Sequence, residues 1–266
     1  MINLLYNIPC FLLFILICIS CITISYLTTR LVHRYISLKQ RYDENPAIVC
    51  ISALIGIIYA ILIGFIVLYE LNNFNKVDEA ENREAKAMFT IFRESYILPE
   101  TSGAKIRSQL IEYANYVINN EWPMMATGKF TDNTGALMIE NISKKIRSFN
   151  ISKINNPLII QALNTMSMNA NYLFDDHQLR INNIHSTLSS NIWFVLLLSS
   201  LLTIGVNCIL GMEFRFHIVC IIFLSLMVSG VLYLIVTLDR PYRGDFSIQP
   251  DTYKATLDYI NLKISS

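Results

Sequence analysis

Four apolar runs, each long enough to cross a membrane as a helix, constrain this chain more than any other feature. They cover residues 8–27, 48–69, 192–212 and 216–238. Crossing the hydrocarbon core takes about 20 residues of helix, because a helix satisfies its backbone hydrogen bonds within the segment. The sequence therefore predicts an all-α membrane protein with four transmembrane helices in two pairs. We expect the first run to be a retained helix rather than a signal peptide, since no basic stretch precedes it and no small-residue cleavage motif follows.

The composition is typical of a membrane protein. Hydrophobic residues make up 53% of the sequence and charged residues only 15%, whereas soluble domains average about 25% charged residues. The 21 basic and 20 acidic residues nearly balance, so no charge excess points to nucleic acid. The expected partner is the lipid bilayer, and nucleic acid is not expected.

The runs divide the chain into four parts. Residues 1–70 hold the first two membrane helices and a basic connection, 71–190 form a helical extramembrane domain, 191–240 form a transmembrane hairpin, and 241–266 are a C-terminal tail. Apolar residues in the middle domain recur at helical spacing. We expect the helix that begins at Pro157 to continue unbroken into the third run, and the third and fourth runs to be joined by only three residues.

The second run carries two parallel stripes of side chains. Small residues recur every four positions and would let another helix approach closely: Ser52, Gly56, Ala60 and Gly64. Bulky apolar residues form a second stripe, rotated by about 100° on the helix: Ile57, Ile61 and Phe65. If subunits in a ring packed through the small stripe, the bulky stripe could form a hydrophobic pore constriction. The alternative is that it faces lipid or neighbouring helices.

Two further features lie in the C-terminal half. Asn207 is a polar residue inside the third run, and we expect it to hydrogen-bond another helix. The fourth run ends in four charged residues around Pro241. This segment is either the solvated end of a membrane helix or a fixed elbow that organises a subunit contact or a pore mouth.

The sequence shows no arrangement typical of an enzyme or a metal site. The four histidines are scattered, and the six cysteines lie within or at the edges of apolar runs. We therefore expect no catalytic residues, no cofactor and no metal. A buried cluster of Glu121, Asp176 and a histidine would revive the possibility of a membrane enzyme.

Several motifs resemble those of the bestrophin-like family of bacterial membrane proteins. One is the segment Glu121, Trp122 and Pro123. A more specific one follows the fourth run, Leu-Asp-Arg-Pro-Tyr-Arg-Gly, with Asp239, Arg240, Pro241 and Gly244 at its characteristic positions. The family has phenylalanine where this chain has Tyr242, which preserves the aromatic ring.

The resemblance implies a function and a partner. Bestrophins are pentameric ion channels whose second transmembrane helix lines a narrow neck, and the stripe of Ile57, Ile61 and Phe65 is similar to that neck. It implies a homo-oligomer, with a pentamer favoured, that passes inorganic ions across a bacterial inner membrane, its middle domain forming a vestibule or collar. The alternative function is a membrane-anchored scaffold or sensor whose helical domain binds a partner.

The side of the membrane that the middle domain faces is predicted differently by two arguments. The first connection carries Arg30, Arg34, Lys39 and Arg41, and the positive-inside rule would place it in the cytoplasm. The resemblance places the middle domain there instead, and we favour the resemblance.

Overall fold

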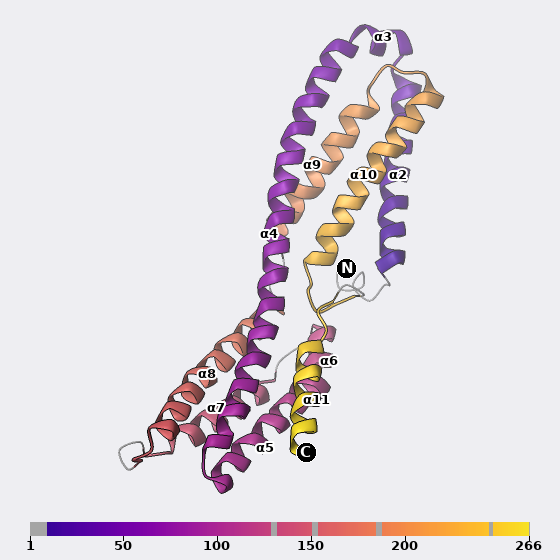
Figure 1. Ribbon diagram of the computed structural model, residues 1–266. Helices are drawn as coiled ribbons and strands as arrows, with labels where there is room; N and C mark the ends of the chain where they lie inside the picture. Colours follow the sequence, from indigo (N-terminus) through magenta and orange to yellow (C-terminus); the bar gives the residue numbers. More distant parts are fainter. Residues whose placement is uncertain (1–9, 129–131, 151–153, 185–187, 245–246, 266) are drawn as a thin grey trace. The chain divides into compact units, whose positions relative to one another are not determined.

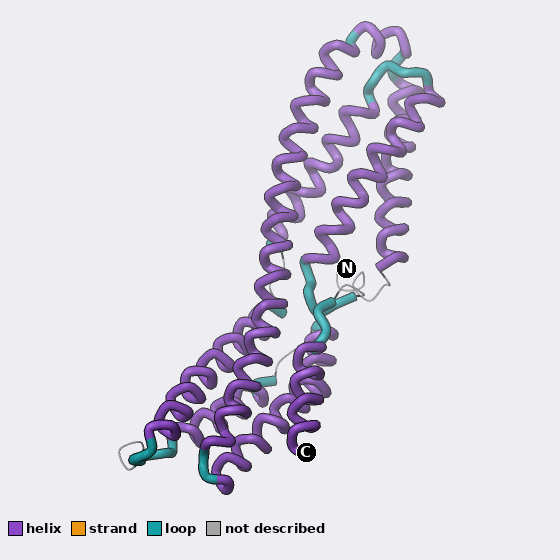
Figure 2. The backbone as a smooth tube through the Cα atoms, viewed as in Figure 1, coloured by secondary structure: helices purple, strands orange, loops and turns teal. Residues whose placement is uncertain are grey.

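The computed structural model describes residues 10–128, 132–150, 154–184, 188–244 and 247–265. Every regular element in these ranges is a helix, so the all-α prediction is confirmed (Figures 1 and 2). The chain divides into two compact units. The first comprises residues 1–73, 187–240 and 244–246, and the second comprises 74–186, 241–243 and 247–266.

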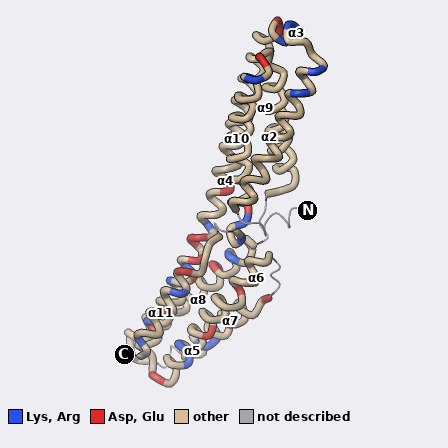
Figure 3. The backbone as a smooth tube through the Cα atoms, turned by 90° about the vertical axis from the view of Figure 1, so that its right-hand side faces the viewer, with Lys and Arg blue, Asp and Glu red and all other residues tan. Residues whose placement is uncertain are grey.

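The first unit contains the four apolar helices that the sequence predicts. They are α2 (Cys10–Tyr35), the first part of α4 (Asn45–Glu94), α9 (Ser190–Cys208) and α10 (Phe214–Leu238). A short helix, α3 (Leu38–Asp43), connects α2 to α4. Each of the four is long and apolar enough to cross a membrane. Among the described residues, the charged positions of this unit lie mainly along α3 and the neighbouring connections (Figure 3).

Small polar side chains join α2 to α10. The Ser25 and Ser225 hydroxyls lie 2.7 Å apart, and Cys18 Sγ lies 3.2 Å from Ser229 Oγ. Small residues let helix backbones approach closely, and a hydrogen bond between them is not exchanged for water inside a bilayer. These contacts, together with apolar packing, explain why α2 lies along α10.

The α9–α10 hairpin is antiparallel, as predicted, but its connection is longer than the three residues expected. Helix α9 ends at Cys208 and α10 begins at Phe214, which leaves residues 209–213 between them. Gly211 explains the early end of α9. A Cβ atom at this position would lie 2.6 Å from the backbone nitrogen of Tyr42, so the connection lies against α3 instead of continuing the helix.

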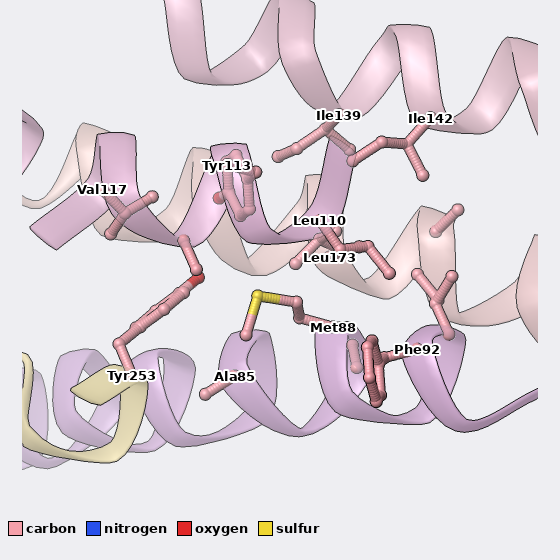
Figure 4. Close-up of a cluster of buried hydrophobic side chains, with 14 of the residues drawn as sticks. Ala85, Met88, Phe92, Leu110, Tyr113, Val117, Ile139, Ile142, Leu173 and Tyr253 are labelled. Carbon is pink, nitrogen blue, oxygen red and sulfur yellow. The ribbon is translucent and has the colours of Figure 1, made fainter. Parts of the chain in front are cut away.

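The second unit is a bundle around its own apolar core. Its helices are the last part of α4, the 3₁₀ turn η1 (Ser95–Ile97), α5 (Glu100–Tyr116), the π-helix η2 (Val117–Glu121), α6 (Trp122–Thr127), α7 (Thr134–Arg147), α8 (Pro157–Asn182) and α11 (Asp251–Ser265). Figure 4 shows Met88, Leu110 and Ile142 meeting in this core. Helix α11, in the segment predicted as a tail, adds the buried side chains of Tyr253 and Ile260.

Two helices differ from what the sequence suggests. The prediction of one unbroken helix from Pro157 through the third run was wrong, because α8 ends at Asn182 and α9 begins at Ser190. The Ser189 side chain accepts a hydrogen bond from the backbone of Ile192 and so starts α9 as its N-cap. Helix α4, by contrast, continues for 50 residues, since its sequence holds no proline or glycine between Gly64 and Glu94.

Candidate functional site

The bulky stripe of α4 is exposed in the single chain. Ile57, Ile61 and Phe65 are 59%, 57% and 71% exposed. Only 11% of the most apolar stretch of α4 is buried, against 28% to 33% in the other three membrane helices. Helix α4 is therefore the apolar helix of the first unit that its own chain covers least.

The small stripe beside it is also largely open. Outside its own stretch of α4, a Cβ atom placed on Gly56 or Gly64 would meet no atom of the described residues within 4 Å, and Ala60 is exposed. Ser52 differs, because its Oγ donates a hydrogen bond to Asn207 Oδ1 on α9 at 3.0 Å. Three of the four small residues thus leave room on α4 that no described residue of the first unit fills.

The opposite face of α4 packs against the first unit. The Tyr59 and Ser200 hydroxyls lie 3.0 Å apart, and Ile63 is buried among side chains of α9 and α10. This attachment fixes which way the helix faces. The bulky stripe therefore points away from the other helices of the first unit.

The second unit holds a buried ion network that the sequence analysis missed. The Arg180 guanidinium contacts Glu84 Oε2 through Nε at 2.8 Å, and Nη2 contacts Glu84 Oε1 at 3.0 Å and Glu121 Oε2 at 2.7 Å. All three side chains have no exposed area. Two carboxylates on α4 and η2 are thereby tied to one cation on α8.

His177 and Tyr113 complete this network. The Tyr113 hydroxyl donates to Glu84, and His177 Nδ1 lies 3.2 Å from Tyr113 Oη and 3.0 Å from Arg180 Nη2. Both hydrogens of Arg180 Nη2 already bind carboxylates, so this nitrogen has none left for His177. The count places a hydrogen on His177 Nδ1, which donates it to Tyr113.

Electrostatics in the network follow from this arrangement. Burial alone would raise the pKa of Glu84, but the charge of Arg180 and its hydrogen bonds outweigh burial and hold that pKa below its ordinary value. Burial beside Glu84 raises the pKa of Tyr113. Glu84 and Arg180 are therefore an ion pair with a neutral tyrosine beside them.

Glu121 reaches the network because of an irregular helix and a glycine. It ends the π-helix η2, which adds a residue to the turn and changes the direction of the side chains that follow. A Cβ atom on Gly135 would collide with Glu121 Oε1. Gly135 lies in the first turn of α7, where the helix dipole favours a carboxylate.

The cluster that would have indicated an enzyme forms only in part. His177 Nδ1 lies 3.8 Å from Glu121 Oε2, but Asp176 instead pairs with Arg83 at 2.8 Å. The network is closed to solvent, with His177 only 2% exposed. No metal-binding group of three or more ligands is found among the described residues. Of the four histidines in the sequence, His185 lies outside the described residues.

Residues of the two sequence motifs form hydrogen bonds that hold the second unit together. Trp122 Nε1 donates to the Ile248 carbonyl oxygen at 3.0 Å, and Pro123 lies in the first turn of α6. The Pro241 carbonyl oxygen accepts from the backbone of Ile248 at 2.8 Å. Tyr242 is buried and donates to the Arg180 carbonyl oxygen at 3.4 Å.

The end of α10 contains the remaining motif residues. Asp239 is 2% exposed and accepts a hydrogen bond from the backbone of Leu188 at 2.6 Å. This contact ties the residues before α9 to the end of α10. Arg240 follows it, and Gly244 adopts φ 81°, a left-handed conformation that favours glycine. Asp239 and Gly244 therefore have structural reasons for their residue types.

These features define an all-helical, multi-pass membrane protein with a bare apolar stripe on its second membrane helix. A model of the bestrophin-like domain matches residues 17–253. The chain therefore belongs to the bestrophin-like family.

Solved structures share the fold at low sequence identity. A mutant of a bacterial bestrophin homologue from Klebsiella pneumoniae superposes with a TM-score of 0.70 at 14% identity, covering 94% of this chain and 99% of that chain. A further crystal structure of the Klebsiella pneumoniae homologue gives 0.67 at 12% identity, covering 92% and 97%. No curated protein matches the sequence.

Proposed function

We propose that this chain is a subunit of a homo-oligomeric ion channel, with a pentamer favoured, in a bacterial inner membrane. Ile57, Ile61 and Phe65 form its hydrophobic constriction. The observation that carries the proposal is that these three side chains, on the helix least covered by its own chain, are all more than half exposed. Membership in the bestrophin-like family supports a channel over an enzyme.

The two stripes of α4 fit a ring of subunits. A neighbouring copy would pack on the open strip of Gly56, Ala60 and Gly64, where a helix can come close. The bulky stripe is rotated by about 100° from this contact, so it would face the axis of the ring. Each subunit would then contribute three apolar layers, spaced by about 6 Å, which is the rise of four residues.

Such a constriction would control the passage of ions through its own hydration. An ion must keep its hydration shell or replace it, and apolar rings offer no replacement ligands. A narrow apolar passage therefore dewets and blocks conduction until it widens. Removing one layer of large side chains would make the passage easier to hydrate and would raise the current.

Current through purified protein in planar bilayers tests this function. Ile61→Ala and Phe65→Ala should each raise conductance or open probability. Phe223→Ala is the matched control, because Phe223 is 66% exposed but lies on α10, and it should conduct like the unchanged protein. A silent preparation, or equal effects of Phe65→Ala and Phe223→Ala, would contradict the proposal.

Subunit counting separates the channel from a scaffold or sensor anchored in the membrane. Native mass spectrometry of protein released from detergent should give a closed oligomer, with five subunits expected. A monomer or dimer would favour the scaffold, since neither can enclose an axial pathway.

A further inference from the structure

Two connections between membrane helices are clasped together in the first unit. Arg41, on α3, donates through Nη1 to the carbonyl oxygen of Leu210 at 3.0 Å. Its Nη1 and Nη2 also lie 3.0 Å from the two ring nitrogens of His33. His33 Nε2 lies 3.0 Å from His217 Nδ1, although 184 residues separate the two imidazoles in sequence. Arg41 is 2% exposed and His217 is 1% exposed.

Backbone contacts reinforce this clasp. The side-chain amide of Asn45 donates to the Gly211 carbonyl oxygen at 3.1 Å, and its Oδ1 accepts from the Gly211 backbone nitrogen at 2.8 Å. Gly211 itself lies so close to Tyr42 that it has no room for a Cβ atom. The residues before α4 and those between α9 and α10 are thus held as one structure.

The hydrogen positions in the clasp follow from one acceptor. His217 Nε2 lies 3.0 Å from the Asn207 carbonyl oxygen, which can only accept, so this nitrogen carries a hydrogen. In the neutral ring Nδ1 is then an acceptor, and it receives the Nε2 hydrogen of His33. His33 Nδ1 in turn accepts from Arg41 Nη2, whereas Arg41 Nη1, which also lies 3.0 Å from His33 Nε2, directs its hydrogen to the Leu210 carbonyl oxygen. Both imidazoles are therefore neutral, with the hydrogen on Nε2.

An additional proton on either imidazole disrupts this series of hydrogen bonds. It can enter at His33 Nδ1, or at His217 Nδ1 if the bond between the imidazoles reverses and His217 donates to His33. His33 then carries its hydrogen on Nδ1, facing a guanidinium that can only donate. A second positive charge also lies beside Arg41, and like charges in direct contact repel.

Nothing nearby compensates for that charge. On the elements packed around the two imidazoles, the acidic residues are Asp43 and Glu44 beside α3 and Glu213 before α10. All three are exposed, and none forms an ion pair with Arg41, His33 or His217 among the described residues. The Nε of Arg41 is also buried, and no described residue accepts a hydrogen bond from it.

We propose that the Arg41–His33–His217 clasp is a proton-operated catch that is closed at neutral pH and opens when either imidazole is protonated. Opening releases Arg41 from Leu210 and frees α3. Helix α4 begins at Asn45, four residues after Arg41, so release loosens the start of the helix that carries the bulky stripe. If that stripe conducts, which rests on the proposed function, acidification on the side of the clasp changes the current.

The hydrogen positions can be measured directly in the unchanged protein. In full-length protein labelled with ¹⁵N-histidine in lipid nanodiscs at pH 7.5, nuclear magnetic resonance should show His33 and His217 as neutral rings with hydrogen on Nε2. Single His→Gln variants assign the signals. Hydrogen on Nδ1 of either ring would overturn the proposal.

Hydrogen exchange of the α3 backbone tests the opening. After correction for intrinsic rates, protection of α3 should fall on acidification from pH 8 to pH 5. One linked proton changes the opening equilibrium by up to about tenfold per pH unit. The double variant His33→Gln with His217→Gln keeps one donor and one acceptor on each side chain but cannot titrate. It should remain protected throughout, whereas His177→Gln in the second unit should behave like the unchanged protein.

Two results of the exchange experiment would overturn the catch. One is constant α3 protection in the unchanged protein, and the other is the same loss of protection in the double variant. If α3 of the double variant is unprotected at both pH values, the substitutions themselves have opened the clasp. The ¹⁵N-histidine measurement on the unchanged protein then decides whether the proposal holds. Neither measurement uses an ion current, so the catch and the channel can fail separately.

Discussion

Arg180 is a buried cation that two buried carboxylates of the second unit share. Arg180→Met leaves Glu84 and Glu121 buried without their partner, which costs about 3–5 kcal/mol of unfolding free energy. The chain has two tryptophans, so in a Trp193→Phe background the fluorescence of Trp122 reports unfolding of this unit.

Two comparisons sharpen that measurement. Arg93→Met removes a half-exposed guanidinium from α4 and should cost at most about 1 kcal/mol. Adding Glu84→Gln and Glu121→Gln to Arg180→Met removes the orphaned charges and should recover much of the loss. If Arg180→Met unfolds at the same denaturant concentration as Arg93→Met, the network does not stabilise the fold.

Gly135 tests how tightly Glu121 is held. In Gly135→Ala, the new Cβ would meet Glu121 Oε1 and would lie 2.9 Å from His177 Cε1. Crowding of this kind costs about 1–3 kcal/mol, seen as an earlier Trp122 transition. Asn141→Ala, at an exposed position on the same helix, should leave the transition in place. Equal stability of the two variants would show that Glu121 moves aside freely.

Glu81 gives the second unit a dependence on pH. Burial, followed by the charges of Asp78 and Glu84, raises its pKa to about 7. A raised folded pKa means that the stabilisation is complete below the unfolded pKa and is lost as pH rises through the folded value. Stability should therefore fall between pH 5 and pH 8. Glu84 does not alter this window, because its lowered pKa affects stability only in stronger acid.

Glu81→Gln should remove this decline. The Trp122 transition of the variant should be nearly independent of pH from 5 to 8 and should lie above that of the unchanged protein at pH 8. A decline that persists in Glu81→Gln would assign it to another group.

The ion network could have been foreseen in part from the sequence. Glu84 precedes Met88 and Phe92 at intervals of four, and Arg180 and His177 continue the apolar face of Leu173 on α8. A charged residue on an apolar helix face signals a buried partner. What the sequence could not supply is the pairing, because it depends on how α4, η2 and α8 pack and on one extra residue in the turn of η2.

At the scale of elements, apolar length and spacing predicted the four membrane helices and the helical character of the rest. They failed at boundaries, where local hydrogen bonds decide. Ser189 starts α9 as an N-cap and separates it from α8, and Gly211 ends the third run early through its contact with α3. Both residues occur in the sequence, but their effect depends on a neighbour that hydropathy does not identify.

The small stripe of α4 yields a prediction about assembly. Gly64→Leu fills space that is open in the protomer, so the helix content of the chain should not change. If neighbouring copies pack at this strip, the larger side chain separates them and native mass spectrometry shows smaller species. Gly230→Leu on α10, where a Cβ also meets nothing within 4 Å, should assemble normally. An intact oligomer in Gly64→Leu would remove the strip from the interface.

At the scale of the whole molecule, the structure joins residues that the sequence leaves unrelated. His33 and His217 looked scattered, and only the adjacency of two helix connections makes them a pair. The same adjacency secures the beginning of α4, whose outward face carries the bulky stripe. Sequence spacing predicted that this stripe exists. That it points away from its own chain required the packing of Tyr59 and Ile63.

The central claim is that ions pass along Ile57, Ile61 and Phe65, and chemical modification of a conducting protein tests it most directly. The six native cysteines are replaced by serine or alanine, and Ile61→Cys is compared with Phe223→Cys. A charged methanethiosulfonate reagent should change the bilayer current of Ile61→Cys irreversibly and leave that of Phe223→Cys unchanged. An unaltered current through Ile61→Cys, when mass spectrometry shows complete labelling, would contradict the account.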